Sequence, residues 1–520
     1  MMRGRITGLT VIIVALFGVV LAQAWFVQVH RASALNSSAT NPRIADASRI
    51  YPRGEILGAG GVVLARSIPT GLLEYPYRRS YPLGALTSDV VGYSSINFGT
   101  GATEYAYNRF LVSHQQPARS LGQLISPVHS ADNVFLSLQV ALQQVAARSL
   151  AGRDGAVVAI DPRDGSVLAM YSNPTYNPAP LTSTYYSASC GCFPIEAAAW
   201  KRYTTDDANH FPPLGNVATQ ETFPPGSTFK VITTSAIYRY EPSLASYSWG
   251  PANHLSLEPY SSIPLYNSGF GACGGTIQSM LPESCDPGYG QLGILLGGTF
   301  LHNQADQEGY NATPPLDLGD VAGNRAVLPS YFPPISFFSP ANGGPPALAY
   351  SAIGQQNVRS TALQGALVAA GIADGGKIMA PHFLREILDA QGNLVLRYRP
   401  YAWHHPLGAQ MAANVTALMR AVVTNGTASG VGFLPQDEVA AKTGTAQTSL
   451  SSVNLHTDDW MIAFAPASRP VVAVAVVVPN QSNFDWGATV AGPIVKCVIE
   501  GALALDAKQP PAGTPTTCPR

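Results

Sequence analysis

The sequence predicts an α+β fold in which an antiparallel sheet lies between layers of helices and follows a smaller, mainly β module. Residues 155–162 and 166–171 are apolar runs joined by a tight Asp-Gly turn, which is typical of antiparallel neighbours in a sheet. Residues 471–478 form a nearly unbroken Val and Ala run, as expected of a central strand covered on both faces. Residues 490–507 repeat apolar side chains on one helical stripe, so a helix should pack on that sheet.

Length, charge and composition indicate a large globular protein and exclude some classes of partner. The chain has 520 residues, which is room for two or more domains and a large core. Its net charge of −1 implies neither nucleic acid nor a strongly anionic surface as a partner. The 49 Gly and 42 Pro are spread along a chain that is 46% hydrophobic, which indicates a loop-rich globular protein rather than a disordered one.

Residues 6–29 carry no charge and are long and apolar enough to cross a bilayer, with Arg3 and Arg5 before them. By the positive-inside tendency, the N-terminus stays in the cytoplasm and the rest of the chain is exported. A cleaved signal peptide is the alternative, because Ala22-Gln23-Ala24 resembles a small-residue cleavage site. We favour an uncleaved single-pass anchor over residues 1–30, because the apolar run continues past that site.

Six cysteines would then lie in a compartment where disulfides can form. The sequence does not choose among their pairings. Their spacing is not a zinc pattern, since there is one C-x-C, no C-x2-C and no histidine at ligand spacing, so structural or free thiols are the interpretation. The six are Cys190, Cys192, Cys273, Cys285, Cys497 and Cys518.

Residues 31–132 are predicted to form the smaller N-terminal module. A hairpin is expected where residues 51–57 and 62–65 flank a Gly-Gly turn. Beyond it, short strands and turns are expected, including residues 90–93 and 99–104.

Residues 133–508 are predicted to form the main domain. Ser137 should cap a helix over residues 138–150, after which the sheet begins. A largely helical insertion is expected over residues 180–440, with a Pro- and Gly-rich loop at 306–346. The closing strands are expected at 442–448, 460–465 and 471–478. The Pro/Thr-rich tail, 509–520, should be unstructured.

The motif that carries chemistry is S-x-x-K at Ser227 and Lys230, after a Pro-Pro-Gly turn. Residues three apart on a helix share a face, so the Lys230 amine should reach the Ser227 hydroxyl. An amine with a lowered pKa can take the serine proton without any histidine, which is the logic of S-x-x-K acyl transfer. Such a match is common by chance, but of the six lysines Lys230 alone has a serine three positions before it.

Two further motifs follow in order. Ser284-Cys285-Asp286 is the candidate proton shuttle, placed where a helical stretch ending near Glu283 should give way to a loop. Lys442 then opens Lys-Thr-Gly-Thr. Taken alone, K-T-G could be an edge strand ending in a turn, and Asp286 before a Pro-Gly pair an ordinary turn former. The order of the three motifs favours catalysis over these structural interpretations.

These residues resemble the class B penicillin-binding proteins, which are membrane-anchored D,D-transpeptidases of the penicillin-binding and serine β-lactamase superfamily, and most of all the actinobacterial penicillin-binding protein A branch. The resemblance implies a pedestal and a transpeptidase domain whose antiparallel sheet lies between helical layers. It covers nearly the whole chain and rests on residues 53–54, 99–104, 156–176, 223–234, 284–286, 354–382, 426–427, 442–447 and 459–466.

The resemblance implies a role for each motif residue. Ser227 would be the acylated nucleophile and Lys230 its general base. Ser284 would relay a proton to the departing D-alanine. Lys442 would keep that relay electropositive and help bind the substrate's terminal carboxylate.

The strand at Lys442 would also bind substrate. Thr443, Gly444 and Thr445 would line the edge on which the peptide docks as an added strand. The backbone N–H groups of Ser227 and Thr445 would form the oxyanion hole. Asp286 departs from the pattern, because most of the family has asparagine there; an ionised aspartate only accepts hydrogen bonds, whereas asparagine also donates.

The implied function is that of a cell-wall D,D-transpeptidase that takes a D-Ala-D-Ala stem peptide, releases D-alanine and passes the acyl group to an amine of a neighbouring stem. It would be inhibited by β-lactams, need no metal or cofactor, and work beside a membrane glycosyltransferase of the shape, elongation and division type. The alternatives are a D,D-carboxypeptidase or β-lactamase, in which water replaces the amine, and a β-lactam sensor or divisome scaffold without turnover. The anchor and pedestal argue against a β-lactamase.

Overall fold

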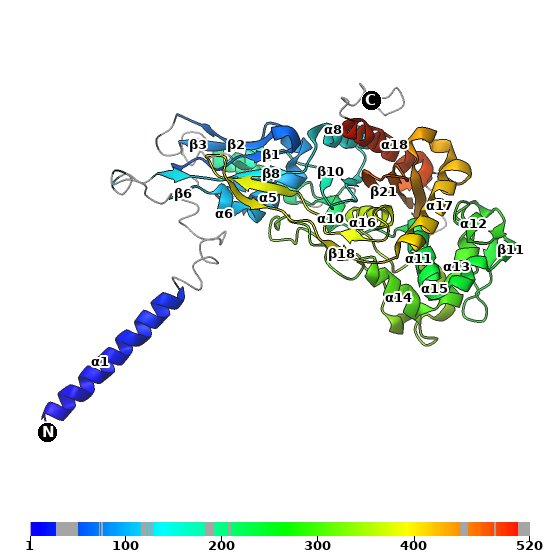
Figure 1. The fold of residues 1–520 in the computed structure, drawn as a ribbon, viewed down its shortest axis with the longest axis horizontal. Helices are drawn as coiled ribbons and strands as arrows, with labels where there is room; N and C mark the ends of the chain where they lie inside the picture. Colours follow the sequence, from blue (N-terminus) through cyan, green and yellow to red (C-terminus); the bar gives the residue numbers. More distant parts are fainter. Residues whose placement is uncertain are drawn as a thin grey trace.

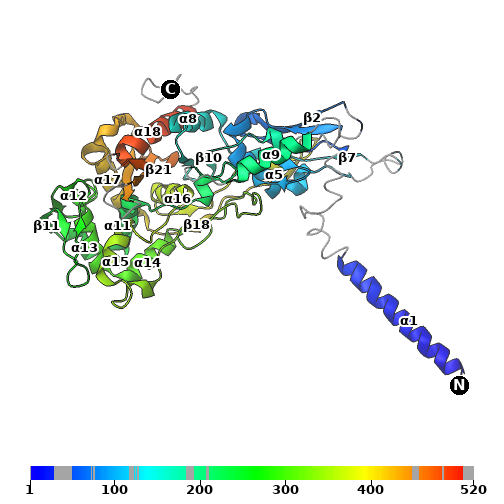
Figure 2. The ribbon, with the colours of Figure 1, turned by 180° about the vertical axis from the view of Figure 1, so that it is seen from behind.

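The computed structural model describes residues 2–27 and 50–507, apart from short gaps within 72–75, 116–127, 183–191, 206–209, 448–455 and 483–484. The predicted tail at 509–520 lies outside the described residues, as do Cys190 and Cys518. Figures 1 and 2 show an elongated body with an N-terminal sheet at one end and a helical region at the other.

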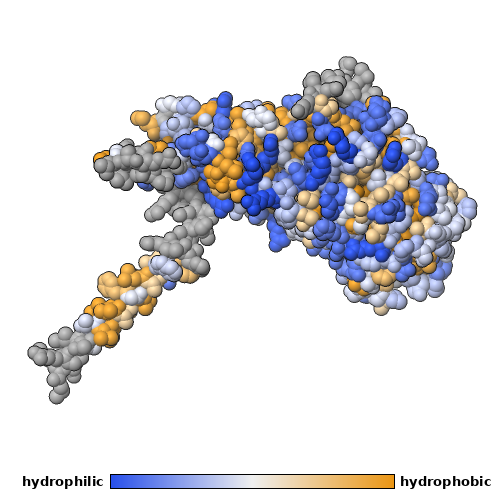
Figure 3. Space-filling model, in the orientation of Figure 1, coloured by the Kyte–Doolittle hydropathy of each residue, from blue (hydrophilic) through white to orange (hydrophobic). Residues whose placement is uncertain are grey.

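Helix α1, Met2–Trp25, covers most of the predicted anchor. Its apolar side chains are largely exposed, with Val14 at 65% and Phe17 at 67%, and they form an apolar surface away from the body (Figure 3). Among the described side chains, the helix that is long and apolar enough to cross a membrane is α18, Gly487–Asp506, but 56% of it is buried inside the protein. Its burial makes α18 a core helix.

The N-terminal sheet has the strand order β17-β16-β8-β1-β2-β3, and Figure 1 labels β8, β1, β2 and β3. The predicted hairpin is confirmed, since β1 and β2 pair antiparallel around the Gly60-Gly61 turn. β16 and β17 come from far along the chain, within the stretch that the sequence assigned to the helical insertion, yet β16 pairs with β8. The strands are β1 (Ile56–Leu57), β2 (Val63–Pro69), β3 (Tyr77–Ser80), β8 (Asn133–Leu136), β16 (Leu384–Leu388) and β17 (Leu394–Arg397).

Shorter elements cover this sheet. They are η2 (Ala59–Gly61), η3 (Gly84–Leu86), α4 (Ser88–Val91), β4 (Ser94–Ser95), β5 (Gly99–Thr100), α5 (Ala102–Ala106), α6 (Asn108–Leu111), β6 (His114–Gln115) and β7 (His129–Ser130). The expected strand at residues 90–93 is wrong, because Val90 and Val91 end the short helix α4. Both are fully buried in that helix, so their β propensity was overridden by packing.

Ser137 does not cap a helix, contrary to the prediction. Its hydroxyl donates to the carbonyl of Val167 at 2.7 Å, and α8 (Val140–Leu150) begins after Gln139, which makes no side-chain cap. Ser137 therefore joins the end of β8 to the start of β10 rather than starting the helix.

The main sheet has the order β10-β9-β21-β20-β19 and is antiparallel throughout, with β21 in the centre as predicted. Helix α16 (Ala362–Ala373) packs on one face, and α18 with α8 on the other (Figures 1 and 2). β19 is an edge strand, which leaves one side of it open for another chain. The strands are β9 (Gly155–Ile160), β10 (Val167–Asn173), β19 (Ala440–Gln447), β20 (His456–Ala465) and β21 (Val472–Ser482).

The predicted insertion is largely helical. Its helices are η4 (Ala179–Thr182), α9 (Cys192–Thr204), α10 (Val217–Gln220), η5 (Gly226–Phe229), α11 (Lys230–Tyr240), η6 (Pro242–Ser246), η7 (Ser268–Phe270), α12 (Ile277–Met280), α13 (Asp286–Leu296), α14 (Gly298–Gln307), η8 (Ile335–Phe338), α15 (Gly344–Ala352), α17 (Ala409–Asn425), η9 (Ser429–Val431) and η10 (Pro435–Asp437). Its strand pairs are β11 (Trp249–Ala252) with β14 (Cys273–Gly275), β12 (His254–Leu255) with β13 (Leu265–Tyr266), and β15 (Ile378–Met379) with β18 (Ala402–His404).

Candidate active site

The segment that carries Ser227 lies directly against the edge strand β19. Ser227 is in η5 and Lys230 begins α11. Gly226 has φ +53°, and a Cβ on it would be 3.0 Å from the Thr445 carbonyl carbon; a Cβ on Gly444 would be 2.7 Å from the Pro225 oxygen. Glycine at both positions therefore lets the backbones of η5 and β19 approach closely, which brings partly exposed Ser227 beside K-T-G.

Lys230 is fully buried, and its ammonium group has three acceptors. Its Nζ donates to Ser284 O at 2.6 Å, to Asp286 Oδ1 at 2.7 Å and to Ser284 Oγ at 3.3 Å. Among the described contacts, no hydrogen bond joins Lys230 to Ser227, although the sequence predicted that pair. An ammonium has three N–H donors and no lone pair, so Lys230 must lose a proton before it can act as a base.

Ser284 lies between the two lysines of the motifs. Lys442 Nζ donates to Ser284 Oγ at 2.9 Å and to its neighbour's carbonyl, Thr443 O, at 2.9 Å. Ser284 has φ +59°, a left-handed conformation that points this hydroxyl into the site. Because the hydroxyl accepts from both lysines, its own hydrogen is left to donate, as a proton relay requires.

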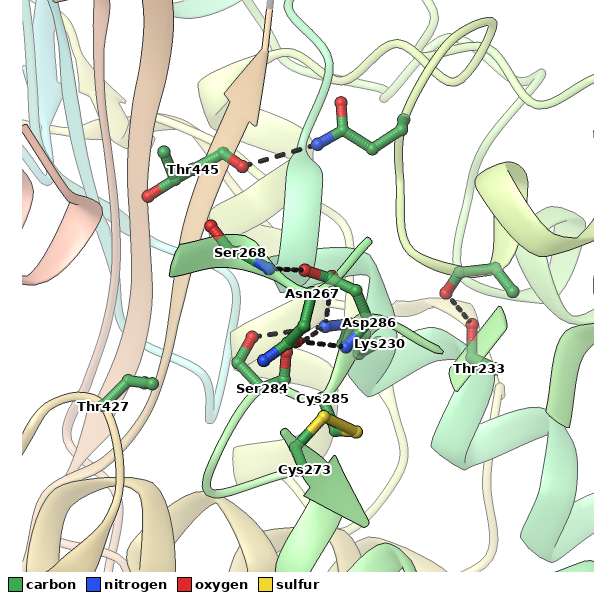
Figure 4. Close-up of polar contacts among 12 residues, drawn as sticks. Lys230, Thr233, Asn267, Ser268, Cys273, Ser284, Cys285, Asp286, Thr427 and Thr445 are labelled. Carbon is green, nitrogen blue, oxygen red and sulfur yellow. Dashed lines mark hydrogen bonds and ion pairs between the residues drawn. A yellow bond between two sulfur atoms is a disulfide. The ribbon is translucent and has the colours of Figure 1, made fainter. Parts of the chain in front are cut away.

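Asp286 begins helix α13 rather than a loop, which corrects the prediction for this segment. Cys285 is the N-cap residue, and Pro287 stands at the start of the helix, where proline is favoured. Asp286 Oδ2 accepts from the backbone N–H of Ser268 at 3.0 Å, and Asn267 Oδ1 accepts from the backbone N–H of Asp286 at 3.0 Å (Figure 4). Both carboxylate oxygens of Asp286 therefore accept hydrogen bonds, which is the pattern of an ionised group.

A disulfide holds this motif in place. Cys285, between Ser284 and Asp286, is bonded to Cys273 of β14 (Figure 4). The sequence left the cysteine pairings open, and this one ties the relay serine to a strand of the helical region. Among the described residues, no three His, Cys, Asp or Glu side chains are placed to hold a metal ion.

The surroundings of the site lower the pKa values of both lysines. Burial lowers the pKa of Lys230, and the Asp286 carboxylate opposes that shift. Burial and the nearby Lys230 charge lower the pKa of Lys442 well below its usual value, again against Asp286. A lysine with a lowered pKa can accept a proton near neutral pH, which is what an acyl-transfer site requires.

The structure adds partners that the sequence did not identify as functional. The hydroxyls of Thr427 and Thr443 lie 2.6 Å apart, and Gly487 N donates to Thr445 Oγ1 at 3.0 Å. Thr427 stood in a resembling segment but without a role. Asn267 and Ser268, which hold Asp286, belong to no motif and could not be identified from the sequence.

The structure thus brings all eight predicted site residues to one junction between β19, η5 with α11, and the start of α13. The eight are Ser227, Lys230, Ser284, Asp286, Lys442, Thr443, Gly444 and Thr445.

Comparisons with known proteins agree with this arrangement. Residues 155–500 match the penicillin binding protein transpeptidase domain, and residues 53–130 match the penicillin binding protein A dimerisation domain. The chain is 30% identical to the peptidoglycan D,D-transpeptidase PbpA of Mycobacterium tuberculosis and 31% identical to that of Mycolicibacterium smegmatis, each over 96% of this chain and 99% of the relative.

Solved structures give the same result. The ceftriaxone acyl-enzyme of penicillin-binding protein A from M. tuberculosis superposes with a TM-score of 0.77 at 31% identity, covering 88% of this chain and 100% of that one. The D,D-transpeptidase domain from Eggerthella lenta superposes with a TM-score of 0.73 at 27% identity, covering 88% of this chain and 100% of that one. This chain therefore belongs to the penicillin-binding protein transpeptidases, a family of serine enzymes.

Proposed function

We propose that this chain is a peptidoglycan D,D-transpeptidase that cross-links stem peptides through an acyl-enzyme on Ser227. The observation that carries the proposal is that two buried lysines, Lys230 and Lys442, converge on the Ser284 hydroxyl beside a partly exposed serine. Together they provide a nucleophile, a base and a relay at one point, without a histidine.

The steps balance with these groups. Neutral Lys230 takes the Ser227 proton while the serine oxygen attacks the carbonyl of the penultimate D-alanine. The backbone N–H groups of Ser227 and Thr445 face the developing oxyanion, where each such donor contributes ~3 kcal/mol. The proton then passes through Ser284 to the nitrogen of the departing D-alanine, so the C–N bond breaks as the ester forms. An amine of a second stem then attacks the ester and loses a proton, which passes through Lys230 to the Ser227 oxygen as the C–O bond breaks and the serine is released.

Substrate is proposed to dock along β19. A stem peptide can pair with its open edge as an added strand at Thr443, Gly444 and Thr445. Thr445 is partly exposed there, and Gly487 N–H occupies one acceptor site of its hydroxyl, so the hydroxyl hydrogen can donate to the terminal carboxylate of the substrate or the carboxylate of a β-lactam. Asp286 holds Lys230 in place, and Lys442 in its protonated form keeps the site positive for that carboxylate.

Transpeptidation is tested with a donor stem peptide ending in D-Ala-D-Ala and a second stem as amine acceptor. We expect a cross-linked dimer in the mass spectrum, with one D-alanine released per dimer. Release of D-alanine with only the hydrolysed stem would assign the chain as a D,D-carboxypeptidase. A lasting acyl-enzyme without either product would assign it as a β-lactam sensor or scaffold.

The chain is further proposed to be an extracytoplasmic enzyme on a single membrane anchor. The exposed apolar surface of α1 supports this, since such a surface needs a covering. Residues 31–132 would then form the pedestal and 133–508 the transpeptidase domain, beside a membrane glycosyltransferase that supplies glycan strands.

The anchor makes a definite prediction for cells that express the full chain. Membrane-fraction protein should keep the residues of α1, and protease added outside intact cells should remove the tail beyond Gln509. N-terminal sequencing of the membrane fraction and protease digestion of the intact cells measure the two outcomes. A mature protein that starts at Trp25 would instead establish a signal peptide.

A further inference from the structure

Asp459 is a buried carboxylate that the proposed mechanism does not use. It lies on β20 directly opposite Thr445 of β19. Side chains of directly opposed residues in an antiparallel pair lie on the same face of the sheet, ~5 Å apart at Cβ. Asp459 is fully buried, and neither of its oxygens has a hydrogen-bond partner among the described residues.

Burying a carboxylate without a hydrogen-bond partner costs free energy of folding. The position of Asp459 beside β19, the strand on which substrate is proposed to dock, therefore needs a physical explanation. The Thr445 hydroxyl has one hydrogen and two acceptor sites, and the N–H of Gly487 takes one of those sites. The protonation state of Asp459 therefore decides the direction in which the Thr445 hydroxyl donates its single hydrogen.

We propose that Asp459 is a positioning residue for the carboxylate subsite, which sets whether the Thr445 hydroxyl donates outward to the carboxylate of a substrate or β-lactam. A protonated Asp459 donates its own O–H to the second acceptor site of Thr445, and the threonine hydrogen then points to the ligand. An ionised Asp459 accepts the threonine hydrogen instead and adds a second negative charge beneath the ligand's carboxylate. The proposal rests on the proposed function, in which Thr445 meets that carboxylate.

The surroundings of Asp459 make both protonation states accessible near neutral pH. Burial, together with the charges of Asp485 and Asp458, raises its pKa to about 7, and the hydroxyls of Thr445 and Thr457 oppose that rise. From the other packed elements, β21 presents Val478 opposite Asp459, and α18 begins with Gly487. Lys442 lies on the other face of β19, where it contacts Ser284.

The test compares acylation by penicillin G with acylation by its methyl ester, which lacks the carboxylate. The rate ratio of acid to ester cancels the titration of Lys230, because both reagents need the same base. In the native full chain the ratio should fall on the order of tenfold between about pH 6 and pH 8.5, since a hydrogen bond to a charged group is lost.

Two variants show whether Asp459 causes the fall in the ratio. Asp459→Asn keeps a donor toward Thr445 at every pH, so its ratio should stay flat and exceed the native ratio at high pH. Asp458→Asn is the matched control: it removes a carboxylate from the adjacent residue, whose side chain lies on the other face and accepts from Asn480 N at 3.1 Å. Its ratio should fall by as much as the native one but at slightly lower pH, because Asp458 contributes to raising the pKa of Asp459.

A flat native ratio, or an Asp459→Asn ratio that falls like the native one, would overturn the inference while leaving the transpeptidase assignment intact. If Asp459→Asn does not fold, Asp459→Ser, which also keeps a donor at every pH, takes its place with the same expected flat ratio. Absence of acylation at Ser227 by either reagent would instead refute the proposed function.

Discussion

Ser227→Ala is expected to lose covalent labelling by penicillin completely while keeping the native fold. The reason is that the acyl bond forms on the Ser227 oxygen, and alanine has none. Intact mass after incubation with penicillin measures the loss. Peptide mapping of the labelled native protein should place the adduct between Thr222 and Lys230.

The control for this substitution is Ser243→Ala, which removes an exposed serine hydroxyl from η6, just beyond α11. It should be labelled at the native rate. Ser227 is partly exposed and makes no side-chain hydrogen bond among the described contacts, so its loss should leave the melting temperature nearly unchanged. An adduct on folded Ser227→Ala would refute the nucleophile assignment.

Asp286→Asn is expected to accelerate penicillin acylation at neutral pH by on the order of tenfold or more. The Asp286 carboxylate, 2.7 Å from Lys230 Nζ, opposes the lowering of the Lys230 pKa by burial. An opposite charge at such a distance shifts a pKa by roughly 1–3 units, so its removal increases the neutral, basic fraction of Lys230. The measurement is the second-order acylation rate from about pH 5 to 9 for both proteins.

The sign of the pH dependence follows from the ion pair. Lys230 becomes a base only as it loses a proton, so the native rate should rise with pH toward its pKa. In Asp286→Asn that rise should occur at lower pH, and the ratio of variant to native should shrink as pH increases. A protonated Asp286 would give the opposite trend in the native rate, but the N–H groups of Lys230 and Ser268 on its two oxygens argue against it. Superimposable profiles would show that Asp286 does not control Ser227.

The main sheet could be predicted because its strands are continuous apolar runs. A run without polar alternation indicates a strand that is buried on both faces. The Val and Ala run of β21 and the turn between β9 and β10 were enough to define its centre and one edge. The N-terminal sheet was only half predictable, since β16 pairs with β8 across a long sequence separation and β17 joins the sheet through β16. No local pattern specifies such a partner.

The candidate site was likewise predictable in part. The motifs named the residues proposed to move the proton in acyl transfer, because that chemistry needs particular side chains at particular spacings. The resting partner of Lys230 was not predictable from helical spacing, since the ammonium is directed by Asp286 and Ser284 from another segment. Asp459 was also missed, because a carboxylate in an apolar strand carries no motif; it becomes visible when the register places it opposite Thr445.

The late arrival of β16 and β17 constrains how the chain can fold during synthesis. Until residue 388 has been made, β8 is an edge strand with unpaired backbone groups, because its antiparallel neighbour β16 is not yet complete. The first sheet to be synthesised is therefore among the last to be finished, and the two ends of the enzyme must mature together. During synthesis the N-terminal module therefore has an exposed strand edge at β8. Such an edge can pair with the wrong strand, and binding of a chaperone would protect it.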